Sequence, residues 1–522
     1  MTARIILAFW LSSPCALAQV AEMARFEKEV KASDDLIVPI SLLDNGLALV
    51  QSLNEYEKAK RKWEFTRLDT TLAKVNSEIL ALENQAQLVG HDYYRQQLSV
   101  LFRLGDNNLN DLILVRFNTL WQAETYKISL QLNFKPSHFI TLANTAILGG
   151  YLGLDPVVVT YQFAERQASV LPGFLMKDTE LLDLRANQNG TFNVLLFEHS
   201  RLAHRIAFKT FDDQGALLLE DIIPIKENDY VLSAVTSTLR NDQLMVVGTW
   251  GTNRGRLSKG IFATSVDPFT DQPVHYTSFA EIDHYLDYLP DRKAKAIVEK
   301  AKEARQRGRE PDFGSYFSLY KFEEIANSFW VYGEVYQPSS GTTLPPPVYN
   351  PFYDPFYGGS FASPYGLNPW AGRPYSYNTP PGVPSGPTEH RIFESVGIRF
   401  SPEGKIIQSF SQPSGDFKTE FIEQVGDFGV WNITPMLALK HEKDILVSYV
   451  RPTYDNIQRD TLTLAGRSPG EVIRNESKVN TGVRHWFANY FFGWGEHTVR
   501  AKQGEAPEAE NRHVFYVSKI RF

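Results

Sequence analysis

Short apolar strands that end in a polar turn residue recur along this chain, and their spacing limits the folds that it can adopt. They occupy residues 63–69, 114–118, 206–212, 261–267, 397–401 and 519–522. Asp69 and Asn118 lie 49 residues apart, and Asp212 and Asp267 lie 55 apart. The 94 residues between Asn118 and Asp212 equal two units of 47. The pattern indicates a structural unit of about 50 residues that occurs several times.

Further runs of four to eight residues, rich in β-branched and aromatic side chains, lie between clusters of Asp, Asn and Gly and are typical of strands. These runs are residues 47–50, 112–117, 157–161, 192–197, 244–250 and 329–336. A repeated unit of this length matches one four-stranded blade of a β-propeller. We therefore predict an all-β fold, a β-propeller of about seven four-stranded blades. The alternative is a large, irregular β-sandwich whose strands merely recur.

One fifth of the chain, residues 244–338, resembles a segment of uncharacterised secreted envelope proteins of gram-negative bacteria. The resemblance rests on residues 247–251, 260–262 and 332–338 and on a basic helix after Leu286. It implies an exported, β-propeller-like protein and brings no known activity with it. The chain lacks the Trp-Asp dipeptides of WD repeats and a regular Gly-Gly spacing, so the type of blade stays open.

The first 18 residues are typical of a secretory signal peptide. Arg4 supplies the positive charge, residues 5–11 form a short apolar run, and residues 16–18 read Ala-Leu-Ala, which predicts cleavage before Gln19. Seven apolar residues are too few to span a bilayer, so we expect no transmembrane helix in the mature chain. The predicted organisation is a signal peptide (1–18) and one propeller domain (19–522), with a periplasmic, cell-surface or extracellular location.

The first predicted insertion, residues 283–311, contains a helix over 291–307. Its apolar residues recur with the helical period, Pro290 and Asp291 suit its start, and Gly308 suits its end. Residues 291–309 contain eight Lys and Arg but only three Asp and Glu, so the helix is basic. The helix is either solvated and packed on the propeller, or a contact for anionic lipid, nucleic acid or an acidic partner.

The second predicted insertion, residues 338–387, holds 13 Pro, 7 Gly and 10 aromatic residues, with Asp354 and Arg373 as its only charges. Proline prevents a helix or an interior strand here, while the aromatic side chains still need to be covered. The loop either packs on the propeller or binds a partner. If it binds a partner, we expect the anchors to be Tyr353, Phe356, Tyr357, Tyr365 and Trp370.

Motifs for chemistry are almost absent from the sequence. No phosphate-binding glycine loop, zinc-protease motif or nucleophile elbow occurs, and the only cysteine is Cys15. His199 and His204 are five residues apart, a poor spacing for a metal pair on a helix. Adjacent carboxylates, Glu323-Glu324 and Glu220-Asp221, suit a glycosidase only if folding sets a pair about 5–9 Å apart. We expect no cofactor, no metal site and no catalytic residue.

The formal net charge of −7 leaves no global basic field to recruit nucleic acid. The function favoured by the sequence is a non-catalytic, exported propeller that acts as a binding or scaffold protein of the bacterial cell envelope. Its partner would be a protein or a glycan of the envelope. Two alternatives stay open: a secreted hydrolase or lyase acting on glycans or peptides with carboxylates in the propeller channel, and an outer-membrane β-barrel. The barrel alternative rests on the alternating C-terminal strand that ends in Phe522.

Overall fold

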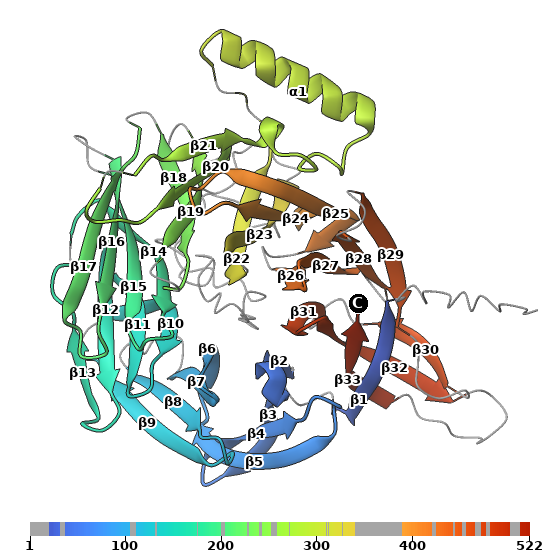
Figure 1. Cartoon of the computed structure of the whole chain (residues 1–522). Helices are drawn as coiled ribbons and strands as arrows, with labels where there is room; N and C mark the ends of the chain where they lie inside the picture. The colour runs from blue at the N-terminus through green and yellow to red at the C-terminus, as the bar shows by residue number, and fades with distance from the viewer. Residues whose placement is uncertain are drawn as a thin grey trace, which may run out of the picture.

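Eight antiparallel sheets are arranged as a ring in the computed structural model of the protein (Figure 1). Seven sheets have four strands and the eighth has five. The chain is an eight-bladed β-propeller. The residues that the structure describes are 20–31, 37–104, 111–130, 133–174, 176–199, 204–226, 229–239, 243–251, 258–270, 272–309, 311, 313–325, 327–339, 389–419, 424–441, 444–450, 456–464, 471–476, 481–501 and 512–522.

Blades 1 to 4 follow one another along the first half of the chain, each written here from its innermost to its outermost strand. Blade 1 has β2 (Val38–Ser41), β3 (Leu47–Glu57), β4 (Lys60–Leu68) and β5 (Lys74–Glu83), with a 3-10 turn, η1 (Leu43–Asn45), after β2. Blade 2 has β6 (Ala86–Tyr94), β7 (Gln97–Leu104), β8 (Asp111–Phe117) and β9 (Ala123–Ser129). Blade 3 has β10 (Phe134–Thr141), β11 (Thr145–Leu152), β12 (Asp155–Gln162) and β13 (Gln167–Val170). Blade 4 has β14 (Thr179–Ala186), β15 (Phe192–His199), β16 (His204–Phe211) and β17 (Leu217–Pro224).

Blades 5 to 8 complete the ring. Blade 5 has β18 (Tyr230–Thr236), β19 (Met245–Gly251), β20 (Gly260–Ser265) and β21 (His275–Ser278), followed by η2 (Phe279–Glu281). Blade 6 has β22 (Tyr316–Ile325), β23 (Ser328–Ser339), β24 (Glu389–Phe400) and β25 (Ile406–Thr419). Blade 7 has β26 (Gly426–Trp431), β27 (Thr434–His441), β28 (Asp444–Val450) and β29 (Ile457–Thr463). Blade 8 has β31 (Gly482–Phe487), β32 (Tyr490–Ala501), β33 (Arg512–Arg521) and β1 (Ala21–Glu29), and β30 (Glu471–Glu476) pairs with the part of β32 beyond β31.

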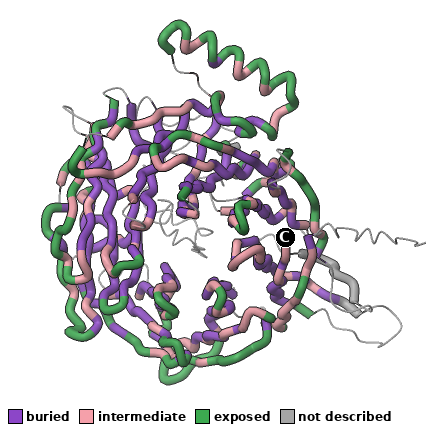
Figure 2. The backbone as a smooth tube through the Cα atoms, in the orientation of Figure 1, coloured by how far each residue is buried: buried purple, intermediate pink, exposed green. Residues whose placement is uncertain are grey.

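In the blades, the inner strands are mostly buried and the outermost strand is more exposed to solvent (Figure 2). The middle strand β15 reads Phe-Asn-Val-Leu-Leu-Phe over six consecutive buried residues, because neighbouring blades cover both of its faces. The outermost strand of the same blade, β17, is mostly exposed. The core therefore lies between blades, and each blade depends on its two neighbours for burial.

The ring is closed by strands from both ends of the chain. β1 pairs with β33, with Ala21 opposite Arg521 and Glu29 opposite Val514. The guanidinium of Arg25 lies 4.1 Å from the centre of the Tyr516 ring, which adds a cation–π contact to the ladder. β1 is the outermost strand of this closing blade.

The prediction of about seven blades was wrong by one. Blade 8 takes four strands from residues 471–521 and its outermost strand, β1, from the N-terminal part of the chain. The C-terminal strand that suggested a barrel is β33, which belongs to this separate sheet and not to one continuous barrel wall. Of the six predicted runs rich in β-branched and aromatic residues, five lie within strands, and the sixth, 244–250, begins one residue before β19.

Helix α1 (Asp291–Gln306) confirms the predicted helix and lies in the connection between blades 5 and 6. Gly308, with a φ of +69°, ends it. Among the described residues, no helix is both long and apolar enough to cross a bilayer.

The longest connections join strand ends on one face of the ring, which we call the loop face. Since strands alternate in direction, the second and third strands of every blade are joined at the face where the innermost strand begins. The two longest connections, 279–315 and 340–388, both join strand ends at this face. On the opposite face the connection between the first two strands of a blade has as few as two residues, as at 95–96 and 488–489.

Candidate functional site

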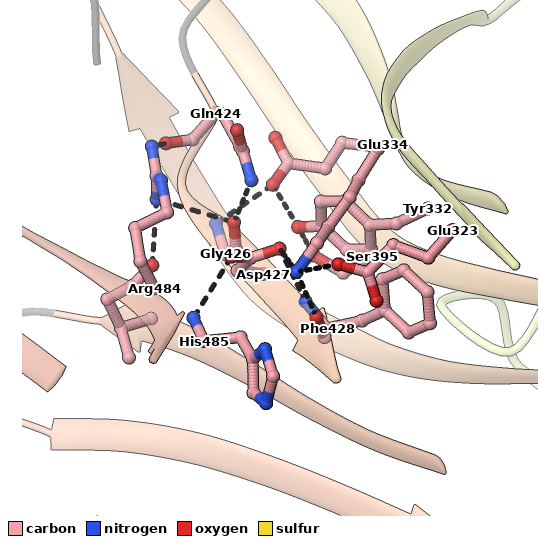
Figure 3. Close-up of polar contacts among 12 residues, drawn as sticks. Glu323, Tyr332, Glu334, Ser395, Gln424, Gly426, Asp427, Phe428, Arg484 and His485 are labelled. Atoms are coloured by element: carbon pink, nitrogen blue, oxygen red, sulfur yellow. Dashed lines mark hydrogen bonds and ion pairs between the residues drawn. The ribbon is translucent and has the colours of Figure 1, made fainter. Parts of the chain in front are cut away.

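Charged side chains meet where the inner strands of blades 6, 7 and 8 approach one another (Figure 3). We call Lys321, Glu323, Glu334, Asp427, Arg484 and His485 the three-blade cluster. Lys321 stands directly after a bulge in β22, where the register shifts between Leu319 and Lys321. The extra residue of a bulge interrupts the alternation of side chains between the two faces of the sheet, and it changes the direction in which the next side chain points.

Lys321 joins blade 6 to blade 7 through a buried ammonium. Its Nζ donates to the carbonyl of Phe428 at 2.8 Å and lies 3.0 Å from Glu323 Oε1 and 3.5 Å from Asp427 Oδ1. The residue is 1% exposed, so its positive charge depends on these oxygens for stabilisation.

Asp427 in turn joins blade 7 to blade 8. Its Oδ2 accepts a hydrogen bond from the backbone N–H of His485 at 3.0 Å, and its Oδ1 accepts one from the N–H of Phe428 at 2.7 Å. Burial lowers the pKa of His485, so this imidazole is held in its neutral form.

Glu334 is a buried carboxyl that receives donors from two blades. It accepts the N–H groups of Gly426 at 2.9 Å and Val425 at 3.1 Å, and the hydroxyl of Tyr332 donates to the same oxygen. Burial raises the pKa of Glu334 to about 7, although these donors and Arg484 oppose the shift. Burial and the neighbouring carboxyl together raise the pKa of Tyr332 well above its ordinary value.

Arg484 completes the cluster by donating to main-chain carbonyls. It reaches Gln424 at 2.7 Å and Gly426 at 3.4 Å in blade 7, as well as Val483 at 2.7 Å in its own strand. The charged groups of the three-blade cluster are therefore engaged with the backbone of the neighbouring blade. This arrangement fixes blades relative to one another, and Glu334 is a proton-binding group enclosed within it.

A second constellation lies at the loop face between blades 4 and 5, and we call it the histidine–tyrosine cluster: Glu180, His199, His204 and Tyr230. The hydroxyl of Tyr230 donates to Glu180 Oε1 at 2.5 Å, and His199 Nε2 lies 3.2 Å from the same oxygen. Both His199 and Glu180 retain a little exposure, 7% and 6% of their side chains. A carboxyl between a phenol and an imidazole can bind a hydroxylic ligand or exchange a proton with it.

The spacing of His199 and His204 suits a β-hairpin, although it is a poor spacing for a metal pair on a helix. The two residues are directly opposite each other across the β15–β16 hairpin, and the ring of Tyr230 lies 5.6 Å from one and 6.0 Å from the other. Glu180 and Tyr230 come from other strands, so only the fold could bring them to this pair. Within the described part of the chain, no three His, Cys, Asp or Glu residues are placed to hold a metal ion.

A groove of about 320 Å³ runs between the outer strands of blades 5 and 6. Residues 275–277 of β21 form one wall and residues 405–409, at the start of β25, form the other. Glu281 and Asp283 contribute carboxylates, and Lys405 and His275 contribute nitrogen groups. Glu281 also forms an ion pair with Arg305 of α1, so the groove lies beside the helix.

The adjacent carboxylates singled out in the sequence do not form catalytic pairs. Consecutive residues of a strand point to opposite faces. Glu323 binds Lys321 while Glu324 is buried, and Glu220 faces Lys209 at 3.1 Å while Asp221 accepts the N–H of Asp267 at 3.1 Å.

The five aromatic anchors predicted in the second insertion lie outside the described residues, and so does the predicted signal peptide. These residues are Tyr353, Phe356, Tyr357, Tyr365 and Trp370. Their role stays a prediction.

Comparison with known proteins found no matching sequence family and no matching curated protein. Among solved structures, the polysaccharide lyase Uly1 shares 8% identity at a TM-score of 0.40, over 95% of this chain and 99% of the lyase. The β-propeller domain of the trilobed protease from Pyrococcus furiosus shares 8% identity at a TM-score of 0.32, over 82% of this chain and 95% of that domain. A prolyl oligopeptidase from Galerina marginata shares 8% identity at 0.39, over 92% of this chain and 55% of the enzyme. Scores this low carry no argument about activity, and the propeller assignment rests on the eight sheets themselves.

Proposed function

We propose that this chain is an exported, non-catalytic β-propeller that acts as a binding or scaffold protein of the bacterial cell envelope. The observation that carries the proposal is the three-blade cluster. Lys321, Asp427 and Arg484 direct their charges at the backbone of adjacent blades. Charges used in this way stabilise a rigid ring and are not available to a substrate.

The uneven distribution of connections supports a binding role. Rigid scaffolds commonly present partner-binding residues on loops. Here the two longest connections, 279–315 and 340–388, both start and end at strand ends on the loop face. The proposed partner is a protein or a glycan of the envelope.

Export rests on the first 18 residues, whose charge, apolar run and Ala-Leu-Ala site are typical of a cleaved signal. It is tested by expressing the full chain with a C-terminal tag in a gram-negative host. The purified protein should come from the envelope fraction and begin at Gln19. An unprocessed chain in the cytoplasm would overturn export.

The binding role is tested by comparing the full chain with a variant that lacks residues 342–385. In vivo cross-linking should give a defined envelope adduct that this deletion abolishes without changing the melting temperature. Adducts that persist unchanged in the deletion variant would remove the loop from the proposal. Turnover of an envelope glycan or peptide by the intact protein would overturn the non-catalytic role.

One observation favours the second candidate, a hydrolase or lyase acting on glycans or peptides. The histidine–tyrosine cluster brings a carboxyl, an imidazole and a phenol together at the loop face. If the chain is an enzyme, Glu180→Gln and Tyr230→Phe should each lower turnover by about 100-fold or more without loss of folding. Turnover that survives both substitutions would exclude this cluster as its site.

A further inference from the structure

Helix α1 stands at the outer rim of the ring (Figure 1). One of its faces packs against the propeller. Ala301 is buried, and Ala294, Ile297 and Val298 pack against the core between blades 5 and 6. At the other end of the helix, Arg305 pairs with Glu281 in the connection from blade 5. The apolar face of α1 is therefore occupied, and its remaining surface is polar.

That polar surface is basic although the whole protein is acidic. Lys302 lies 3.3 Å from Glu299 and Arg307 lies 3.7 Å from Glu303, in exposed pairs that contribute little to stability. Four further cations of the helix are exposed and have no ion-pair partner among the described residues. They are Arg292, Lys293, Lys295 and Lys300.

Helical geometry sorts four of these six cations into two rows, and Arg292 lies on the ridge between the rows. Residues seven apart lie on the same side of a helix, about 10 Å from each other along its axis. Lys293 and Lys300 therefore form one row, and Lys295 and Lys302 form a second row on the other flank. Glu299 and Glu303 lie between the rows, on the ridge that faces away from the buried residues.

We propose that α1 binds a linear acidic polysaccharide, whose carboxylates lie along a lysine row. A narrow, polar chain with charges at regular intervals can follow one flank and avoid the two glutamates on the ridge. The second row lies on the same flank as Arg305, whose partner Glu281 lines the groove that also contains Lys405. Since Glu281 and Asp283 also line this groove, a polymer on that flank would follow the helix and would not enter the groove.

The same geometry disfavours three other anionic partners. A flat membrane would meet the ridge first, where Glu299 and Glu303 outnumber Arg292, and the apolar face that an interfacial helix inserts already packs against the propeller. A single-stranded nucleic acid needs aromatic platforms for its bases, and α1 contains none. An acidic peptide usually adds apolar anchors, which the exposed side of α1 does not offer.

The expected binding is weak at each charge and sensitive to salt. Exposed charges are screened over about 10 Å at moderate ionic strength. A long polymer compensates for the weakness of each contact, because many equivalent positions along it can occupy the same site. The inference deepens the proposed function, on which it depends for the envelope location and for a ligand that is held and not degraded.

The test uses the mature full-length protein and immobilised hyaluronate, a linear polymer with one carboxylate in each disaccharide, in about 50 mM salt. The test variant is K293E/K295E/K300E. Its matched control, K58E/K127E/K177E, changes the net charge equally at exposed lysines of blades 1 to 4. A further variant, E299Q/E303Q, removes the negative charges of the ridge. Circular dichroism and melting temperature verify that all variants fold.

The wild type and the blade control should bind alike, the α1 variant at least about 10-fold more weakly, and E299Q/E303Q more tightly. Equal losses in the α1 variant and the blade control, or no loss in either, would overturn the proposal. So would binding to phosphatidylglycerol vesicles in place of hyaluronate. Size analysis of the recovered polymer separates the two proposals: shortened hyaluronate contradicts the non-catalytic function, whereas intact but unbound hyaluronate contradicts only the role of α1.

Discussion

The carboxylate of Asp427 in blade 7 accepts the backbone N–H of His485 in blade 8 at 3.0 Å. The same relationship recurs twice elsewhere in the ring. Asp92 of blade 2 accepts the N–H of Thr141 in blade 3 at 2.7 Å, and Asp183 of blade 4 accepts the N–H of Thr236 in blade 5 at 2.8 Å. In each case an aspartate on one innermost strand satisfies a buried donor on the next, which joins adjacent blades by a charge-assisted hydrogen bond.

Replacing Asp427 should therefore destabilise the ring. Asp427→Ala removes the acceptor for two N–H groups and one neighbour of the buried Lys321 ammonium, and it should cost about 3–5 kcal/mol of unfolding free energy. Denaturant unfolding measures this loss. The control Glu57→Ala, at an exposed position, should stay within about 0.5 kcal/mol of the wild type. Equal stability of the two variants would show that Asp427 does not join the blades.

Glu334 should make stability depend on pH around neutrality. Its pKa in the folded protein is about 7, above the ordinary value of 4.5, so the folded state holds the proton more tightly. The stabilisation is complete below about pH 4.5 and is lost as the pH rises through 7, by at most about 3 kcal/mol. Glu334→Gln keeps an oxygen for Gly426 and Val425 but cannot titrate. Its melting temperature should fall less than that of the wild type between pH 5 and pH 8, and parallel curves would contradict the assignment.

His91 should act in the opposite direction at acidic pH. Burial lowers its pKa to about 4, so the folded state holds it neutral while the unfolded state gains a proton below about pH 6.5. Stability is therefore lost as the pH falls from 6.5 through 4. Since His91 Nε2 has no hydrogen-bond partner among the described residues, His91→Leu should be tolerated at pH 7 and should raise the melting temperature at pH 5. A variant that is less stable than the wild type at both pH values would refute this explanation.

Closure of the ring can be tested with an engineered disulfide in the mature chain, which contains no cysteine if it begins at Gln19. Ala21 and Arg521 are opposite each other in the β1–β33 ladder. Ala21→Cys with Arg521→Cys should form an intramolecular bond and raise stability by about 2–4 kcal/mol. The control pair, Ala21→Cys with Arg512→Cys, joins opposite ends of the ladder about 30 Å apart and should stay reduced. Equal cross-linking of both pairs would contradict the closure.

The sequence predicted the local elements well because their signals are local. The turn clusters, the apolar runs and the capping residues of α1 depend on neighbours a few positions away, and the strands and the helix appear where these patterns indicate. The pairing of β1 with β33, almost 500 residues away, has no local signal, and the long connections 279–315 and 340–388 interrupt the repeat around blade 6.

The candidate sites could be identified only from the tertiary structure. His199 and His204 were visible as a pair, but Glu180 and Tyr230 join them only when blades 4 and 5 pack together. Lys321 and Asp427 are more than 100 residues apart, and in the sequence each is one charged residue among many.

Amino-acid sequence alone thus determined the strand-rich composition, the repeat length and the basic helix, since each depends on residue type and short-range spacing. Only the tertiary structure decided the eighth blade, the shared loop face and the partners of the buried charges. The physical reason is that the residue type of a lysine does not show whether the side chain is exposed or buried. An exposed lysine and a buried one differ only in which oxygens the fold brings within hydrogen-bonding distance.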